Sequence, residues 1–334
     1  MIAYQFDKFE LTSLRSVELP IPEPGPGQVR LRILARSLNY RDLLIIRGQY
    51  NPRLALPATP LSDAAGLVDS VGPGVQSVCV GDLVMTHFVA AWQDGELRSE
   101  HLRSTLGTPG PGVAAEYVVL PESAVIPTPT GWSAAEAATL PIAGLTAWSA
   151  LVTVGNVQPG QTVLTLGTGG VSIFALQLAQ ARGARVIITS GSDEKLARCR
   201  ELGAWETINH RTTPDWERRV LELTGKAGVD LVVENVGAST LNQSVASTRT
   251  SGTVALLGAI AGMRAELDTG QVLMRRVRIC GVMVDSMAAF HGLRAFLSEK
   301  QIRPVIDRVF PFSALPDALR YMESGAHLGK IVVA

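Results

Sequence analysis

A glycine-rich turn between two apolar segments is the feature of this chain that points most directly to chemistry. The apolar run 163–166 leads into this turn, and a helical pattern and a second apolar run, 185–188, follow it. A strand, a glycine-rich turn, a helix and a further strand form the unit that holds a dinucleotide pyrophosphate. Glycine lets the backbone approach the phosphates, and the free N–H groups of the helix start favour their negative charge. The residues expected at the phosphates are Gly167, Thr168, Gly169, Gly170 and Val171.

The same turn departs from the usual glycine spacing at one position. Ser172 stands where the pattern expects its third glycine. A glycine-rich turn alone also occurs in proteins that bind no nucleotide. The prediction of a dinucleotide site therefore depends on the whole strand–turn–helix–strand context.

From residue 144 to 283, strand-like apolar runs alternate with helical patterns such as 215–223. Alternation of this kind predicts parallel strands joined by crossover helices, which form the doubly wound sheet of an α/β fold. The predicted strands are residues 162–166, 185–189, 206–209, 229–234 and 253–257.

The first 143 residues have a different pattern. Short alternating segments such as 29–33 and 66–71 lie between turns rich in Pro and Gly, which predicts a mostly β domain with barrel-like spacing. Residues 89–112 are predicted to form a long loop, and loops of this length are usually functional or mobile. After residue 283, the sequence predicts helices at 287–299 and 313–323 and a strand at 331–333.

Composition excludes several functional classes. The chain has 334 residues, 46% of them hydrophobic, and 30 basic against 30 acidic side chains, which fits two globular domains and argues against a nucleic-acid partner. No apolar run is long enough to cross a membrane, and the first residues lack a signal-peptide core, so we expect a cytoplasmic protein.

The cysteines Cys79, Cys199 and Cys280 show no metal-binding spacing, which predicts packed free thiols. Among the scattered histidines, His87 and His101 are expected in surface polar roles.

Several further motifs occur in a fixed order along the chain. They are SLNYRDLLIIRGQY, PLSDAAGLVDSVGPGV, VGDLV, AATLPIAGLTAW, LGTGGVS, LGA and GKIVV. In this order and spacing the chain resembles the medium-chain dehydrogenase/reductase superfamily. It is most similar to the zinc-independent, quinone-oxidoreductase-like branch, which includes proteins loosely called alcohol dehydrogenases. The resemblance implies a GroES-like β-barrel catalytic domain, residues 1–143 with 284–334, and a Rossmann NADP(H)-binding domain, residues 144–283.

The resemblance also bears on zinc. Zinc-dependent relatives hold their catalytic metal with a Cys, a His and a second Cys, often beside a Glu. The matching positions here are Asn39, Ser62 and Ile142, with Asp63 at the Glu position. A catalytic zinc needs three good N, S or O donors, and the loop 89–112 has no cysteine for a structural zinc. We therefore predict no zinc at either site.

A hydride can still reach an acceptor without zinc if the acceptor is already electrophilic. Quinones and α,β-unsaturated carbonyls qualify, because conjugation spreads the developing charge onto oxygen. The protein must then orient the acceptor and donate hydrogen bonds to that oxygen, and Asn39 and Tyr40 carry suitable donors. The proton could come from Tyr40 or from water, and a packing role for Tyr40 is the alternative. Asp42 completes the predicted catalytic group, where it is expected to fix the loop or the cofactor.

The expected cofactor is NADPH. Relatives that prefer NAD carry an Asp at the end of the second Rossmann strand, which accepts from the ribose hydroxyls, whereas Ser190 stands there in this chain. A serine can donate to a 2′-phosphate that an acidic group would repel. Lys195 matches a phosphate-binding lysine of similar reductases, and His210 and Arg211 follow the third strand, where a tyrosine often completes the clamp. A cluster of this kind attracts a phosphate, although each residue alone could be an ordinary surface group.

Further cofactor contacts follow from the matched motifs. A threonine at position 146 falls where the family places one against the nicotinamide, and the segments after the fourth and fifth strands lie at the edge where ligands bind. The apolar segment 277–284 is similar to the edge strand that relatives pair across a two-fold axis, which implies a homodimer. The additional predicted cofactor residues are Thr146, Asn235, Val236, Leu257, Gly258, Ala259 and Val284.

These observations favour a zinc-independent oxidoreductase that transfers hydride from NADPH to a small quinone or α,β-unsaturated carbonyl. A zinc-free alcohol dehydrogenase or carbonyl reductase is the alternative within enzymes. A non-catalytic NADPH-binding protein, with a crystallin-like role or an affinity for AU-rich RNA, is the alternative outside them. Neutral charge and the lack of basic–aromatic clusters argue against RNA, and no membrane partner is expected.

Overall fold

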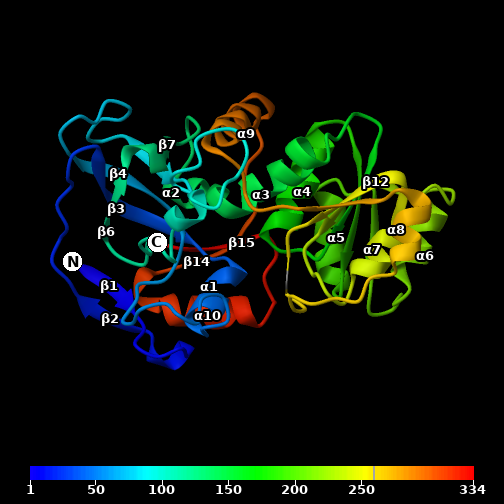
Figure 1. The fold of residues 1–334 in the computed structure, drawn as a ribbon, viewed down its shortest axis with the longest axis horizontal. Helices are drawn as coiled ribbons and strands as arrows, with labels where there is room; N and C mark the ends of the chain where they lie inside the picture. The colour runs from blue at the N-terminus through cyan, green and yellow to red at the C-terminus, as the bar shows by residue number, and fades with distance from the viewer. Residues whose placement is uncertain (259) are drawn as a thin grey trace. The chain divides into compact units, whose positions relative to one another are not determined.

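The computed structural model describes residues 1–258 and 260–334. Contacts within the chain divide it into a first unit, residues 1–143 with 285–334, and a second unit, residues 144–284. Figure 1 follows the chain through both, and each unit has a large sheet of its own. Within the described residues, no helix is long and apolar enough to cross a membrane.

The second unit contains a six-stranded sheet in the order β10-β9-β8-β11-β12-β13. All of its neighbouring strands are parallel. The central strand β8 is buried at every residue, as expected for a strand covered on both faces. The predicted doubly wound α/β sheet is thus confirmed. The strands are β8 (Thr162–Leu166), β9 (Arg185–Ser190), β10 (Glu206–Asn209), β11 (Val229–Glu234), β12 (Thr248–Leu256) and β13 (Arg278–Gly281).

The predicted start of the fifth strand was five residues too late. β12 begins at Thr248, and its pairing with β11 shifts between Thr248 and Thr253, which marks a bulge. The extra residues are polar, and Ser251 has a φ of +59°, so this stretch lacks the apolar pattern of a buried strand.

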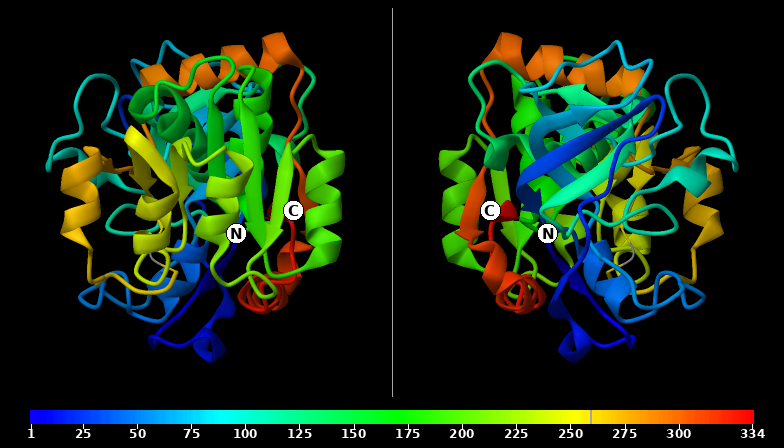
Figure 2. Two further views of the ribbon diagram at one scale, coloured as in Figure 1. Left: turned by 90° about the vertical axis from the view of Figure 1, so that its right-hand side faces the viewer. Right: turned by 90° about the vertical axis from the view of Figure 1, so that its left-hand side faces the viewer.

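Helices pack on both faces of the parallel sheet (Figure 2). The crossover helix α4 contacts β8 and β9, and α7 contacts β11 and β12. Apolar side chains from these layers, among them Leu164, Ile187, Val232 and Val254, form the core. The helices are α3 (Leu145–Trp148), α4 (Gly170–Ala181), α5 (Asp193–Glu201), α6 (Trp216–Leu223), α7 (Leu241–Ser247) and α8 (Thr269–Arg275).

The first unit is built around β3, which pairs with β4, β6 and β15. Its main sheet runs β14-β15-β3-β4-β5-β7, and a separate hairpin joins β1 to β2. The end of the chain therefore completes the sheet that its beginning forms. The strands are β1 (Ile2–Gln5), β2 (Arg15–Glu18), β3 (Gln28–Ser37), β4 (Asp63–Val71), β5 (Leu83–Thr86), β6 (Tyr117–Pro121), β7 (Val125–Pro127), β14 (Ile306–Phe310) and β15 (Lys330–Val333).

Few helices accompany this sheet. The first helix, α1, packs beside α10, although the two are far apart in the sequence (Figure 1). Residues 89–112 form the expected long connection, with one short 3₁₀ turn, His101–Ser104, and an isolated bridge between Val89 and Thr105. The helices are α1 (Tyr40–Ile46), α2 (Ala134–Ala137), α9 (Met287–Lys300) and α10 (Leu315–Glu323).

Candidate functional site

The glycine-rich turn follows β8 and leads directly into α4. Gly167 has a φ of +74°, in the left-handed region that favours glycine, and α4 begins at Gly170. A Cβ atom on Gly167 or Gly169 would meet no atom within 4 Å, so the space over the turn is open. The first N–H groups of α4, from Gly170 and Val171 onward, have no acceptor within the helix and lie at its positive end. Together with the buried Thr168, they form a cradle that fits a dinucleotide pyrophosphate.

Ser172 stabilises this turn rather than weakening it. Its Oγ donates to the carbonyl of Leu166 at 2.7 Å and accepts from Nδ2 of Asn235 at 2.6 Å. The same Nδ2 donates to Leu166 O at 3.1 Å, so the end of β11 is tied to the turn. A Cβ on Gly258 would lie 1.5 Å from Asn235 O, and only glycine allows this contact. The serine thus provides a link that a third glycine could not.

Glu234, which the sequence analysis did not identify, shapes the loop after β11. It is fully buried, and its Oε1 accepts from the N–H groups of Val236 and Gly237 at 2.8 and 2.9 Å and from Thr240 Oγ1 at 2.9 Å. Its Oε2 accepts from Ser244 Oγ. The sequence did carry a signal, because Glu234 directly follows the apolar run 231–233. A carboxylate buried at such a place needs several hydrogen-bond donors.

Three of the residues predicted to select NADPH converge at the end of β9. Ser190 is buried there, and its carbonyl accepts from the N–H of His210 at 3.0 Å. A Cβ on Gly191 would lie 2.7 Å from Arg211 Nε and 3.2 Å from His210 Cε1. One serine hydroxyl, one imidazole and one guanidinium therefore surround the first residue after β9.

The fourth predicted residue, Lys195, lies in the first turn of α5. Its backbone N–H donates to the capping Ser192 Oγ at 3.3 Å. Burial lowers the pKa of His210, and the charge of Arg211 lowers it further. The imidazole is therefore poised to gain a proton when a phosphate approaches.

The other predicted cofactor residues lie at several places in the second unit. Thr146 is buried in α3. The N–H groups of Leu257 and Gly258 both donate to Glu234 O at 3.1 Å, which holds the ends of β11 and β12 together. Val284 has a φ of +33°, a rare conformation for a β-branched residue. Ala259 lies outside the described residues.

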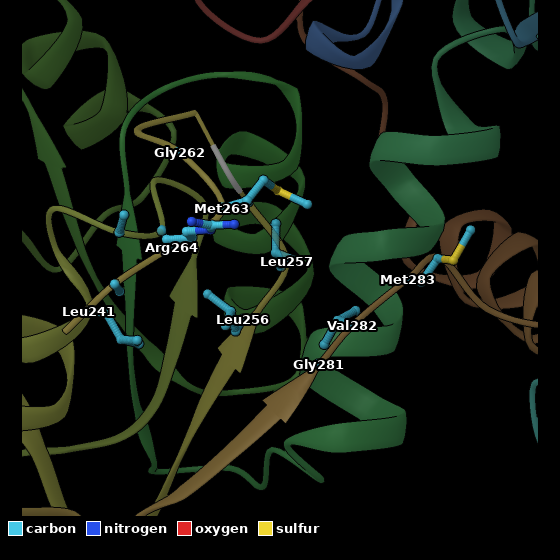
Figure 3. A pocket seen from close by; sticks show the side chains of 13 residues that line it. Leu241, Leu256, Leu257, Gly262, Met263, Arg264, Gly281, Val282 and Met283 are labelled. Carbon is cyan, nitrogen blue, oxygen red and sulfur yellow. The ribbon is translucent and has the colours of Figure 1, made fainter. Parts of the chain in front are cut away.

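A cavity of about 390 Å³ lies where β11, β12 and β13 end. Figure 3 shows Leu241 of α7 and the consecutive Leu256 and Leu257 at the end of β12 among the side chains that line it, with Met263 and Arg264 contributed by the segment after β12. Its lining is mostly apolar, with a guanidinium as the charged group. The cavity is at the carboxyl edge of the sheet, where ligands bind in folds of this class.

In the first unit, Asn39 is the centre of a hydrogen-bond network. Its backbone N–H donates to Asp42 Oδ2 at 2.8 Å, so Asp42 fixes the start of α1. Its Nδ2 donates to Asp63 Oδ2 at 2.9 Å, and its Oδ1 accepts from Lys330 Nζ at 2.8 Å. The N–H of Ile142 donates to the same Asp63 oxygen at 3.2 Å. Four segments far apart in the sequence therefore meet around one amide.

Burial dominates the electrostatics of this network. Desolvation raises the pKa of Asp63 to about 7 and the pKa of Asp42 to about 6, with the Lys330 charge acting against both shifts. Desolvation also lowers the pKa of Lys330. Each carboxyl group has one buried Oδ1 without a hydrogen-bond partner among the described residues.

Tyr40 is the first residue of α1 and lies at the surface of the first unit. Its side chain is 38% exposed, and no hydrogen bond to its hydroxyl occurs among the described residues. The hydroxyl is therefore available to a ligand.

Arg41 is a further residue that the sequence pattern did not single out. Its Cζ lies 4.6 Å from the ring centroid of Tyr50 and 4.7 Å from that of Phe88. Its Nη1 contacts Ser62 Oγ, and its guanidinium donates to two backbone carbonyls of the loop 89–112. Arg41 thus ties this loop to the segment that leads into β4.

The residues at the positions of the zinc ligands in zinc-dependent relatives do not fit a zinc ion. Asn39 Oδ1 faces the cationic Lys330, Ser62 Oγ contacts the cationic Arg41, and Ile142 offers only its backbone. Two cations at these oxygens oppose the approach of a third. No cluster of three His, Cys, Asp or Glu side chains suited to a metal occurs in residues 1–258 and 260–334.

The expected surface role of His87 is wrong. The side chain is fully buried, and its Nε2 lies 2.9 Å from Asp285 O, which assigns the proton to Nε2. Burial lowers the pKa of His87 to about 4. Asp285 is buried as well, and its Oδ1 accepts from the N–H of Ser286 at 2.8 Å. These two residues therefore fix the chain at the start of α9.

The raised pKa of Asp63 makes stability depend on pH. A carboxyl group with a higher pKa in the folded state binds more protons when folded, so the free energy of unfolding falls as pH rises toward the folded pKa. From about pH 5 to about pH 7.5, this group is expected to remove about 2 kcal/mol. Urea unfolding of the wild type and of Asp63→Asn at both pH values measures the effect. An equal loss in both proteins would show that Asp63 titrates in its ordinary range.

Two family models match the chain. One, described as the alcohol dehydrogenase GroES-like domain, matches residues 25–130, and one described as zinc-binding dehydrogenase matches residues 170–299. The first supports the predicted GroES-like class of the N-terminal sheet. The zinc in the second description is a property of that family, and the donor set at Asn39, Ser62 and Ile142 departs from it.

Two relatives extend over nearly the whole chain. A zinc-type alcohol dehydrogenase-like protein of Schizosaccharomyces pombe is 42% identical and covers 96% of this chain and 94% of its own. The quinone oxidoreductase of Rattus norvegicus is 27% identical and covers 99% of this chain and 95% of its own.

Two solved structures have the same fold throughout. An NAD-dependent alcohol dehydrogenase has a TM-score of 0.91 at 35% identity and covers 100% of this chain and 99% of its own. A mycobacterial protein in complex with NADPH has a TM-score of 0.84 at 27% identity and covers 100% of this chain and 99% of its own. Nicotinamide cofactors are thus common to these neighbours, whereas the choice between NADH and NADPH differs.

Proposed function

Because the chain belongs to the medium-chain dehydrogenase/reductase superfamily and is an oxidoreductase of that type, we propose that it reduces quinones or α,β-unsaturated carbonyls with NADPH and without zinc. The observation that carries this proposal is the network around Asn39. It presents hydrogen-bond donors where zinc-dependent relatives present metal ligands.

The preference for NADPH is supported by the groups at the end of β9. A 2′-phosphate needs donors and positive charge, and Ser190, His210 and Arg211 supply both around Gly191. The cradle at Gly167–Val171 would hold the pyrophosphate of the same cofactor. When bound, NADPH supplies the hydride, and these residues bind and orient it.

The first unit would act on the acceptor oxygen. As hydride arrives, negative charge develops on the quinone or enone oxygen, and a positioned N–H or O–H lowers the energy of that charge. The amide of Asn39 and the exposed hydroxyl of Tyr40 are neighbouring donors at the start of α1. Tyr40 or a water molecule would deliver the proton that completes the reduction. The name of the rat relative supports a quinone as one acceptor.

The affinity for NADPH is expected to depend on the protonation of His210. Burial and Arg211 lower the pKa of its imidazole, so it is mostly neutral at neutral pH and gains a charge in acid. Wild-type affinity for NADPH should therefore rise by several-fold relative to His210→Gln between about pH 7.5 and about pH 5.5. Fluorescence titration with NADPH of both proteins at both pH values measures this difference. Protonation of the phosphate affects both proteins equally, so the comparison removes its effect. Parallel curves would place His210 away from the phosphate.

Zinc independence predicts that activity survives chelation. Purified protein treated with a strong chelator is expected to keep its rate with a quinone, and elemental analysis should find no zinc that tracks with activity. One tightly bound zinc per chain, lost together with turnover, would overturn this part of the proposal.

A zinc-free alcohol dehydrogenase or carbonyl reductase is the second candidate. The names of the Schizosaccharomyces pombe relative and of the solved NAD-dependent alcohol dehydrogenase favour this candidate. Tyr40 offers an exposed hydroxyl as the acid. It predicts turnover of a saturated ketone, which lacks the conjugation that the leading proposal requires.

We also propose a homodimer formed through β13. This strand is at one end of the parallel sheet, so one side of its backbone is open to a further strand. Met263, Leu273 and Met274 are 88%, 75% and 81% exposed, and a monomer would leave these apolar side chains in water. Light scattering is expected to give twice the mass of one chain. A double variant, Leu273→Glu with Met274→Glu, should give the mass of one.

A cytoplasmic location belongs to the same proposal. All three cysteines are free, and burial raises the pKa of the Cys199 thiol to about 11. Thiols that stay unpaired are typical of a reducing compartment. Recovery of the native protein in the membrane pellet of a cell fractionation would contradict this location.

A further inference from the structure

Lys330 is a buried cation that has no role in the reaction as described above. It is 3% exposed at the start of β15, and its Nζ donates to Leu38 O at 2.5 Å and to Asn39 Oδ1 at 2.8 Å. The two bonded residues lie 292 and 291 residues before Lys330 in the sequence. The strand β15 therefore brings a charged donor directly to the start of α1.

This contact determines which way the Asn39 amide faces. A lysine ammonium has only donors, so the atom it meets at 2.8 Å must be the amide oxygen. The amide nitrogen then points to Asp63 Oδ2 at 2.9 Å, which is an acceptor. A flipped amide would place N–H against the ammonium and oxygen against the carboxyl oxygen. Both contacts would be lost, so Lys330 and Asp63 together leave a single orientation.

That orientation leaves one amide hydrogen unassigned. Nδ2 carries two hydrogens, and the bond to Asp63 uses one of them. Asn39 is partly exposed, in contrast to the fully buried Asp63. The direction of the second N–H is thus fixed by buried neighbours of the amide. The N–H belongs to a residue that is partly open to a ligand.

We propose that Lys330 and Asp63 are positioning residues that lock the Asn39 amide so that its second N–H donates to the acceptor oxygen during hydride transfer. This inference rests on the proposed function of the same residues. Stability alone gives a weak reason for such a cluster, because apolar residues can replace a buried ion pair at little or no cost. A fixed donor orientation is a stronger reason, since a hydrogen-bond donor stabilises developing charge most when it need not turn during the reaction.

The test uses the full chain and three variants. Lys330→Met removes the cation at similar volume, and Lys330→Met with Asp63→Asn removes the charges of both residues. Lys300→Met makes the same change on an exposed lysine at the end of α9, whose only described ion pair is with Glu299. Each protein is examined for the melting temperature, the Kd for NADPH and the kcat with a quinone.

Lys330→Met is expected to lose about 100-fold in kcat, because a misplaced donor loses most of its effect. The double variant should recover part of the melting temperature, since Asp42 is then the only one of the two carboxyl groups beside Lys330 to lose its counter-charge, but not kcat, because no cation holds the amide oxygen of Asn39. The Kd for NADPH should stay within about twofold in all variants, and Lys300→Met should match the wild type.

Recovery of both kcat and melting temperature in the double variant would show that the pair only balances charge, and would overturn the inference. Unchanged kcat in Lys330→Met would do the same. A wild type that reduces no quinone or enone would instead contradict the proposed function itself, so the two failures are distinguishable.

Discussion

Replacing Ser190 with aspartate is expected to weaken NADPH binding by about 100-fold relative to NADH. Ser190 is buried at the end of β9, and His210 and Arg211 lie beside the next residue. A carboxylate there would repel the 2′-phosphate and pair with the guanidinium that otherwise meets it. The same carboxylate would accept hydrogen bonds from the ribose hydroxyls of NADH, so affinity for NADH should hold or improve.

The measurement is the Kd for each cofactor by fluorescence titration of wild type and variant. Ser251→Asp is a suitable control, because Ser251 is an exposed residue of β12, away from the carboxyl end of that strand. It adds the same charge to the same unit. An unchanged ratio of the two affinities in Ser190→Asp would show that the phosphate does not bind at the end of β9.

Replacing Asn39 with alanine is expected to lower kcat by about 100- to 1000-fold while leaving the Kd for NADPH nearly unchanged. The amide is the donor proposed to meet the acceptor oxygen, and its effect is felt mainly as charge develops there. Its loss also removes one of the two donors to Asp63 Oδ2 and the acceptor for Lys330. A lower melting temperature is therefore expected as well.

Two measurements separate these effects. Single-turnover oxidation of NADPH reports the chemical step, and the melting temperature reports the fold. Asn51→Ala removes a partly buried amide of the same unit that donates to Thr108 Oγ1 at 2.8 Å, and it should cost stability with little change in the chemical step. If Asn39→Ala turned over as fast as the wild type, the donor would have to be Tyr40 or water.

The parallel sheet was predictable because its strands are short, apolar and separated by glycine turns. The glycine-rich turn, Ser190 and the segment 210–211 all follow directly from such strands, so their place at one sheet edge could be read from the sequence. The early part of β12 could not, because a bulge and the polar run 248–251 interrupt the apolar pattern.

The network around Asn39 was less accessible to sequence reasoning. Asn39 and Asp42 were identified from their motif, but the partner that orients Asn39 is 291 residues away. Lys330 reads as an ordinary surface residue, because lysines are rarely buried without a partner. Arg41 was missed and His87 was expected at the surface for the same reason. The groups that make their burial possible come from distant segments.

The most direct test of the proposed activity is the oxidation of NADPH with four acceptors: a para-quinone, a cyclic enone, an alkenal and a saturated ketone, each with and without a chelator. We predict turnover of the quinone or the unsaturated carbonyls, no turnover of the ketone, and no effect of the chelator. Turnover of the ketone would favour the alcohol dehydrogenase instead. Tight binding of NADPH with no turnover of any acceptor would contradict the proposed reductase activity.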